Sequence, residues 1–309
     1  MVSFKIKLRQ SSVTNTVFNY MKEQIGLLQG YGQYRTAETY RTTLNSFRRF
    51  RHETDLDFDE LDPTLLADYE FYLRRSGITP NSVAFYLKRL RAVYNKAVEE
   101  GVTEDRYPFR KVSTTSEKTV KRAIPLKAIR QLKELDLSHC PSKCFARDMF
   151  LFSFYTRGMS FVDIALLQKE NLKNGTLSYR RRKTGQALTM RWEPCMQRIA
   201  TAYASPDDSP YLLSIIREPA QDIPRQCHNA LTLINRHLKD LGRSIGLALP
   251  LTMYVARHSW ASIARHEGIP LSVISEGMGH TSERTTRIYL ASLETQVIDR
   301  ANKKILGKL

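Results

Sequence analysis

Almost every segment of this chain has apolar residues at helical spacing, and one stretch alone carries a convincing β signal. Asn174-Gly175 is a two-residue turn of the kind that joins antiparallel strands. Strand-like residues flank this turn at 170–172 and 176–180, and a second turn near Lys183 leads into residues 187–192. The sequence therefore predicts a three-stranded antiparallel meander inside an otherwise helical domain.

The first hundred residues have helical signals only. Asp62-Pro63 and Thr79-Pro80 each place a capping side chain before a proline that suits the first helical position. The helices that begin there run to about Arg75 and Glu100, and helical periodicity also covers residues 12–30 and 36–52. We therefore expect a short N-terminal segment, 1–11, and a compact four-helix domain over residues 12–104.

A second domain follows a change in composition. Residues 105–121 contain Pro108, a Ser/Thr run and several basic residues without periodicity, which predicts a linker. Residues 122–309 then form a mixed helical domain around the meander, with helices expected near 126–135, 144–156, 195–204 and 226–245. Thr252 and Ser282 are expected to cap two further helices, of which the second carries Tyr289. The expected fold class is mainly α with two domains.

The positive charge is large and unevenly distributed. The formal net charge is +17, and residues 105–309 hold 33 Lys and Arg against 18 Asp and Glu. Residues 53–70 hold eight acids and no Lys or Arg, so the rest of the first domain is also basic. Such a distribution favours a polyanionic partner, most often nucleic acid, although a basic protein kept soluble by its charge has the same composition.

Two predicted helices of the first domain each carry a basic face. Arg41 and Arg48 lie on one, and Lys88 and Arg91 lie on the other. These faces could bind a phosphate backbone, and an ordinary solvated face fits them equally well.

Several other classes are disfavoured. The four cysteines lack the spacing of a zinc site or a secreted disulfide framework, so we expect reduced thiols and no metal or cofactor. No apolar run approaches the length of a membrane span, and the N-terminus lacks a signal core. These features predict a cytoplasmic protein without a membrane partner.

Three residues near the C-terminus have the chemistry for attack on a phosphodiester. Arg257 can bind phosphate oxygens with two parallel hydrogen bonds, and His280 can exchange a proton near neutral pH. Tyr289 can serve as a covalent nucleophile once it is positioned and deprotonated. Gly277 and Gly279 interrupt the helix before His280, which places the histidine at a turn.

The order of these residues resembles the tyrosine recombinase, or phage integrase, family. The family shares an arginine, a hairpin lysine, His-x-x-Arg, a turn histidine and a tyrosine nine residues later. Four residues of this chain match that pattern in order and spacing. They are Lys183 for the hairpin lysine, Arg257 for the arginine of His-x-x-Arg, His280 for the turn histidine and Tyr289 for the tyrosine. Residues 12–104 also resemble the SAM-like core-binding domain of the family, including Thr79-Pro80-Asn-Ser before the last helix. The resemblance covers about residues 12–300 and is strongest to recombinases of Bacteroides-type mobile elements and invertible loci.

Two positions depart from the family pattern. Tyr254 replaces the usual histidine before Arg257, and a phenol is a poor proton shuttle near neutrality. Asp163 matches the acid that follows the first arginine, which places Ser160 where that arginine is expected. Arg157, one turn earlier, is the nearest candidate for the role. Otherwise a hairpin arginine fills it, and the candidates are Arg180, Arg181 and Arg182.

The resemblance implies a site-specific DNA recombinase of the integrase or invertase type. Its expected catalytic residues are Tyr289, Arg257, His280, Lys183, Arg157 and Tyr254, with Arg181 among the DNA-binding residues. It further implies a 3′-phosphotyrosyl intermediate without metal or ATP. Its expected partners are double-stranded DNA and a homo-tetramer on two sites, and an accessory DNA-bending protein is left open. The alternatives are a type IB topoisomerase-like enzyme and a catalytically silent DNA-binding regulator.

Overall fold

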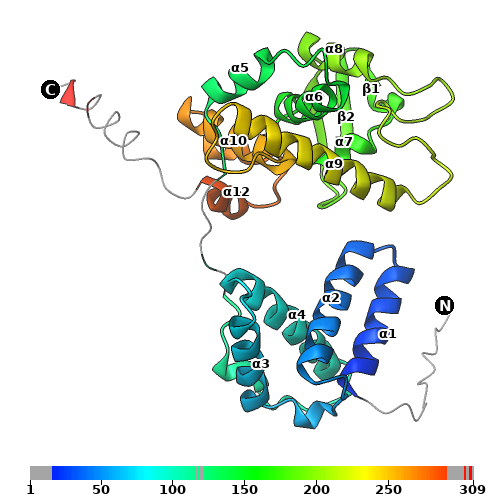
Figure 1. Cartoon of the computed structure of the whole chain (residues 1–309), viewed down its shortest axis with the longest axis vertical. Helices are drawn as coiled ribbons and strands as arrows, with labels where there is room; N and C mark the ends of the chain where they lie inside the picture. The colour runs from blue at the N-terminus through cyan, green and yellow to red at the C-terminus, as the bar shows by residue number, and fades with distance from the viewer. Residues whose placement is uncertain (1–15, 116, 118–121, 291–302, 304–305, 308–309) are drawn as a thin grey trace, which may run out of the picture. The chain divides into compact units, whose positions relative to one another are not determined.

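The computed structural model describes residues 16–115, 117, 122–290, 303 and 306–307, with no side-chain description for 288–290. The chain divides into two compact units, Met1–Thr119 and Val120–Leu309, and each has its own hydrophobic core (Figure 1). No helix among the described residues is long and apolar enough to cross a membrane.

The first unit is built from helices, as its periodicity predicts. Its α-helices are α1 (Val17–Gly30), α2 (Tyr34–Phe50), α3 (Pro63–Arg75) and α4 (Pro80–Glu99), joined by the short 3-10 helices η1 (Phe58–Glu60) and η2 (Pro108–Lys111). Helix α2 packs against α1, α3 and α4. The Asp62 carboxylate accepts from the backbone N–H groups of Thr64 at 2.9 Å and Leu65 at 2.7 Å, so the predicted cap of α3 is confirmed.

The cap predicted before α4 is only partly correct. The helix begins at Pro80, but the Thr79 hydroxyl makes no bond to the backbone and instead contacts Ser82 Oγ at 3.0 Å. Pro80 therefore determines where α4 begins more than Thr79 does, because the proline ring restricts φ to a helical value.

Part of the predicted linker packs on the first unit. Phe109 and Val112 are buried in its core, although residues 105–121 were expected to be a linker. The Tyr94 hydroxyl donates to the Glu104 carbonyl at 3.0 Å and accepts from Arg106 N–H at 2.9 Å, which holds the chain as it leaves α4. Two apolar side chains in a polar segment are too few to give a periodic pattern, so the sequence did not reveal this contact.

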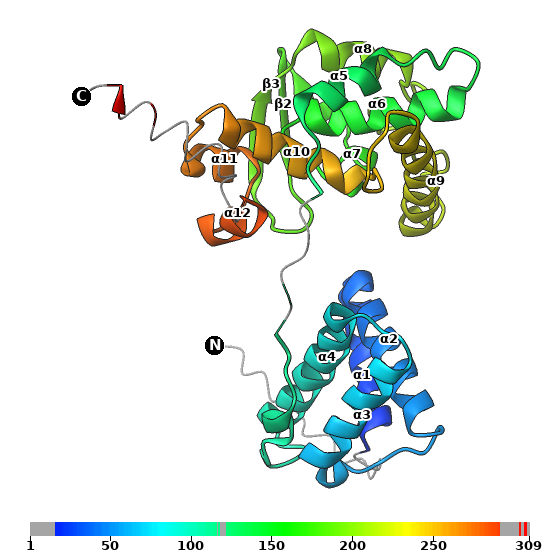
Figure 2. The same ribbon diagram turned by 60° about the vertical axis from the view of Figure 1, so that its left-hand side comes forward.

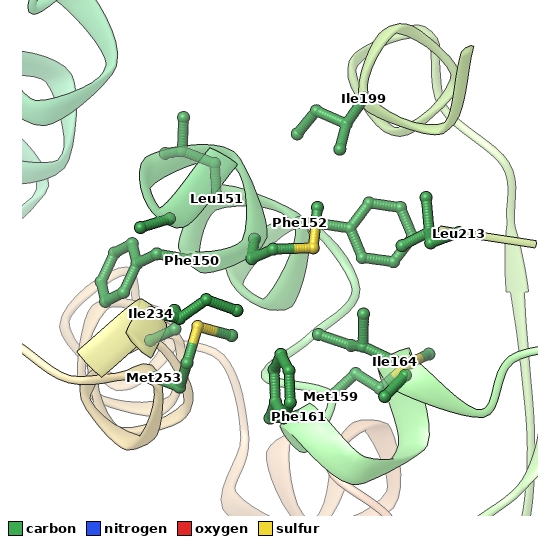
Figure 3. Packing of buried hydrophobic residues seen from close by; sticks show 14 of the residues in the cluster. Phe150, Leu151, Phe152, Met159, Phe161, Ile164, Ile199, Leu213, Ile234 and Met253 are labelled. Carbon is green, nitrogen blue, oxygen red and sulfur yellow. The ribbon is translucent and has the colours of Figure 1, made fainter. Parts of the chain in front are cut away.

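The second unit surrounds one central helix. Its α-helices are α5 (Leu126–Glu134), α6 (Pro141–Tyr155), α7 (Phe161–Ala165), α8 (Pro194–Ala202), α9 (Ile223–Ser244), α10 (Met253–His266), α11 (Leu271–Gly277) and α12 (Glu283–Leu290), with η3 (Lys169–Asn171) before the first strand. Helix α6 packs against α5, α8, α9 and α10. Phe150 and Phe152 of α6 lie in a cluster with Ile199 of α8, Ile234 of α9 and Met253 of α10 (Figure 3).

The predicted meander is confirmed. Strands β1 (Leu172–Lys173), β2 (Thr176–Arg180) and β3 (Ala187–Arg191) form an antiparallel sheet in sequence order. Asn174 and Gly175 both have positive φ angles, 51° and 67°, as a two-residue hairpin turn of this kind requires. Along β2 the buried positions are Leu177 and Tyr179, so every second side chain faces the core.

Candidate functional site

Arg257 lies at the centre of the site, on the buried face of α10. Its side chain is 5% exposed. One terminal nitrogen donates to the Gly158 carbonyl at 2.7 Å, and the other donates to the Met278 carbonyl at 2.6 Å and lies 2.9 Å from His280 Nε2. The guanidinium therefore joins the α6–α7 turn to the end of α11, and both segments are fixed around it.

The backbone of Gly158 approaches α10 closely enough to exclude any side chain. A Cβ atom at this position would lie 2.7 Å from Arg257 Cα, and the φ angle of 76° is in the left-handed region. Glycine at 158 is what allows the carbonyl to reach the guanidinium.

His280 follows α11 at the turn that its glycines predict. Gly279 has a φ angle of 61°, and the His280 Nδ1 atom lies 2.7 Å from the buried Thr286 Oγ1. Arginine can only donate, so His280 Nε2 accepts from Arg257, and Nδ1 carries the proton that it donates to Thr286. This second bond links the turn histidine to α12.

The surroundings of His280 keep it neutral. Burial, then the positive charges of Arg257, Arg181 and Lys183, lower the pKa of this imidazole to about 4. At neutral pH the ring is therefore an acceptor at Nε2 and carries no charge.

Arg181 lies beside this pair, at the end of β2. It continues the alternation of the strand, so its side chain is on the buried face and is 6% exposed. One of its terminal nitrogens donates to the Gly279 carbonyl, directly before His280. The hairpin loop between β2 and β3 thus lies beside the turn between α11 and α12 (Figure 2).

Arg157 has a weaker place in the site. It sits in the left-handed region with a φ angle of 59°, and its Nη1 atom makes a long hydrogen bond, 3.5 Å, to the Thr189 carbonyl. Burial raises the pKa of the nearby Tyr179 phenol. The positive charges of Arg257, Arg181 and Arg157 oppose this rise, so Arg157 lies close to Tyr179. Arg157 therefore lies at the border of the cluster, with its side chain partly exposed.

Lys183 and Tyr254 are at the surface. Lys183 lies exposed in the turn after β2, and its charge contributes to the lowered pKa of His280. Tyr254 is 52% exposed, and its ring packs edge-on against His258 with 4.4 Å between the ring centroids. Tyr254 and Arg257 are three residues apart on α10, yet only Arg257 is buried.

Tyr289 lies in α12, and its side chain is outside the described part of the structure. The helix that carries it is placed by its first turn. Ser282 Oγ accepts from Arg284 N–H at 3.1 Å, in agreement with the predicted cap, and α12 packs against α10 and α11.

The basic residues of the first unit are mostly accessible. Arg41, Lys88 and Arg91 are exposed, while Arg48 is paired with Glu53. No group of three or more His, Cys, Asp or Glu side chains that could hold a metal occurs in the part of the chain that the structure describes.

Two family models match this chain. Residues 16–113 match the phage integrase SAM-like domain, and residues 154–296 match the phage integrase family. The chain is 26% identical over 240 residues to tyrosine recombinase XerA of Pyrococcus furiosus, covering 74% of this chain and 77% of that protein.

A second relative covers more of the chain, and a solved structure shares its fold. Tyrosine recombinase XerC of Chromohalobacter salexigens is 26% identical over 270 residues, 85% of this chain and 87% of that protein. The lambda integrase tetramer bound to a Holliday junction superposes with a TM-score of 0.67 at 15% identity, over 90% of this chain and 78% of that chain.

Proposed function

This chain belongs to the phage integrase family of tyrosine recombinases, and on that premise we propose how its residues cleave and rejoin DNA at specific sites. The observation that supports the proposal best is the contact between the buried Arg257 and a neutral His280. His280 is itself hydrogen-bonded to Thr286 on the helix of the expected nucleophile. A phosphodiester at this contact meets a fixed cation, a proton acceptor and a phenol.

The proposed first step is in-line attack by Tyr289 on phosphorus. The phenolic oxygen forms a bond to phosphorus as the bond to the 5′-oxygen breaks, which leaves a 3′-phosphotyrosyl link. The phenolic proton passes to His280 Nε2, whose basicity rises once the anionic phosphate compensates the neighbouring arginine charge.

Two cations complete this step. Arg257 neutralises the charge that grows on a non-bridging oxygen, and its fixed contacts mean that it needs no reorganisation. Lys183, exposed on the hairpin turn, donates a proton to the leaving 5′-oxygen, a general-acid role worth about 10²–10⁴-fold in rate. Tyr254 borders the site from the position of the missing histidine.

Rejoining reverses the same chemistry. The 5′-hydroxyl of a partner strand attacks the phosphotyrosyl link and releases Tyr289, so the number of phosphoester bonds is conserved and no ATP is consumed. Arg257 again supplies positive charge at the phosphate.

The assembly that we propose is four protomers on two double-stranded DNA sites. A lambda integrase tetramer bound to a Holliday junction shares the fold of this chain, which supports that stoichiometry. We further propose that the protein serves a mobile element or an invertible locus of the Bacteroides type.

A nicked suicide substrate tests the proposal. Cleavage next to the nick releases a short strand that diffuses away, so the covalent adduct accumulates and is seen by denaturing electrophoresis in the presence of EDTA. We expect an adduct with the wild type and none with Tyr289→Phe, which removes the nucleophilic oxygen alone.

Two results would contradict the proposal. Tight DNA binding by the wild type without an adduct would indicate a silent regulator. An adduct with relaxed circles, but no strands joined between two duplexes, would indicate a topoisomerase-like enzyme.

A further inference from the structure

Arg181 is a buried cation whose hydrogen bonding is incomplete. Its side chain is as inaccessible as that of Arg257, 6% against 5% exposed. Its Nε atom is buried and has no hydrogen-bond partner among the described residues, and none of the salt bridges in that part of the chain involves Arg181. A buried, unpaired guanidinium is costly, because water no longer solvates its charge.

The position of Arg181 indicates that an anionic ligand compensates this charge. Arg181 and Arg257 donate to consecutive carbonyls, those of Gly279 and Met278, and the neutral His280 comes next in the chain. Two guanidinium groups therefore converge on one turn. A phosphodiester there would supply the missing negative charge, and planar guanidinium groups match its oxygens well.

The nearby acid Asp163 is engaged elsewhere. One of its carboxylate oxygens accepts from the Ser160 hydroxyl at 2.7 Å, and the other accepts from Arg182 N–H at 3.0 Å. Asp163 thus ties α7 to the hairpin at the residue after Arg181. Asp163 is therefore not the counter-ion of the Arg181 guanidinium.

Arg157 does not match these features. It is partly exposed, in a left-handed backbone conformation, with a long contact to the Thr189 carbonyl. Arg181, in contrast, touches the residue directly before His280.

We infer that Arg181, and not Arg157, is the second arginine of the phosphate site, where it neutralises a non-bridging oxygen beside Arg257. This inference rests on the proposed function. Arg181 is thereby a catalytic residue that contacts the reacting phosphate.

A substrate with a neutral scissile group provides the test. In a suicide substrate, a methylphosphonate replaces one charged non-bridging oxygen with a methyl group. On the natural phosphate, Arg181→Ala should form the covalent adduct about 10²–10³-fold more slowly, as for the loss of one oxyanion donor. On the methylphosphonate much of that loss should vanish, because the charge that Arg181 neutralises is gone.

Arg180→Ala is the matched control. Arg180 is the last residue of β2, faces solvent and donates to the Gly185 carbonyl at 2.6 Å. It should keep the wild-type ratio of rates on the two substrates. Arg181→Lys keeps the charge without the planar fork, so it should lose less activity than Arg181→Ala and serves if the alanine variant unfolds.

The outcomes separate this inference from the proposed function. Wild-type rates with Arg181→Ala, equal losses on both substrates, or a rescue confined to Arg157→Ala would each overturn the inference. An adduct that survives in Tyr289→Phe would overturn the proposed function instead, whatever Arg181 does.

Discussion

His280 shows how burial sets the state of one residue. Its pKa in the folded protein, about 4, lies below its ordinary value of 6.5, first because the ring is buried and then because three cations surround it. The folded state therefore holds fewer protons than the unfolded state between these two pH values. The free energy of unfolding that His280 contributes is full above about pH 6.5 and is lost as the pH falls toward 4.

We predict that His280→Gln flattens this pH dependence. Thermal unfolding of both proteins from pH 4 to 7 would show a smaller loss of Tm in the variant as the pH falls, because glutamine does not titrate. The carboxylates titrate equally in both proteins, so the difference between them isolates His280. Parallel curves would contradict the assignment.

A second prediction at this scale concerns Gly158. Gly158→Ala adds a Cβ 2.7 Å from Arg257 Cα at a positive φ angle, so we expect a loss of about 1–3 kcal/mol in the free energy of unfolding. Covalent adduct formation should fall further than stability explains, because Arg257 is displaced.

Gly268→Ala separates the two costs. Gly268 has a φ angle of 81° and open space around its Cβ position, so this variant bears the backbone strain without the clash. Equal losses of stability and cleavage in the two variants, measured by chemical denaturation and the suicide substrate, would exclude a role for the close approach.

At the scale of elements, the sequence predicted most helices and the meander, because each has a local signal. The turn residues Asn174 and Gly175 and the capping acid Asp62 act within a few residues of themselves. Helix α7 was missed, since five residues are too short to show periodicity. The side chain of Tyr289, the expected nucleophile, lies outside the described residues, so its predicted position stays a prediction.

The position of Arg181 needed the fold. Strand alternation from Leu177 and Tyr179 predicts that residue 181 faces inward, and this signal was available in the sequence. Its partner, the Gly279 carbonyl, lies 98 residues away, and no local pattern connects the two. The sequence therefore suggested Arg181 only as one of several hairpin candidates.

The connection between α7 and the hairpin gives a prediction for an element. Asp163→Ala removes the acceptor of Arg182 N–H and frees the hairpin that carries Arg181 and Lys183. We expect a fall of at least tenfold in the single-turnover cleavage rate, since misplacement by about 1 Å can cost 10²-fold. Affinity for DNA, measured by fluorescence anisotropy, should change little.

Ser160→Ala is the control for this element. It removes the other bond of Asp163 but leaves the contact with Arg182 intact, so the cleavage rate should stay near that of the wild type. If Ser160→Ala lowered the cleavage rate as much as Asp163→Ala, the hydrogen bond between Asp163 and Arg182 N–H would not be the cause of the loss.

At the scale of the whole molecule, the net charge of +17 predicts binding that weakens steeply with salt, because each neutralised phosphate releases counterions. Arg41→Gln should reduce the slope of log K against log salt concentration by about 1, because we expect this exposed residue to neutralise one phosphate. Arg48→Gln should reduce it less, because Arg48 is already paired with Glu53. DNA-binding titrations at salt concentrations from about 50 to 200 mM would measure the slope for each variant. Affinity without salt dependence would contradict this mode of binding.

The contacts of Arg257 with Gly158 and Met278 also predict which catalytic residues would be substituted first in a descendant that is no longer selected for DNA cleavage. The guanidinium fastens segments 99 and 21 residues away from it, so its loss would harm folding as well as chemistry. Lys183 is exposed in a turn, so its substitution would cost little folding stability. A descendant that still binds DNA but no longer cuts it would keep the arginine and lose the lysine. In a related sequence, an intact arginine thus signals only a sound fold, and the hairpin lysine is the better sign of a working enzyme.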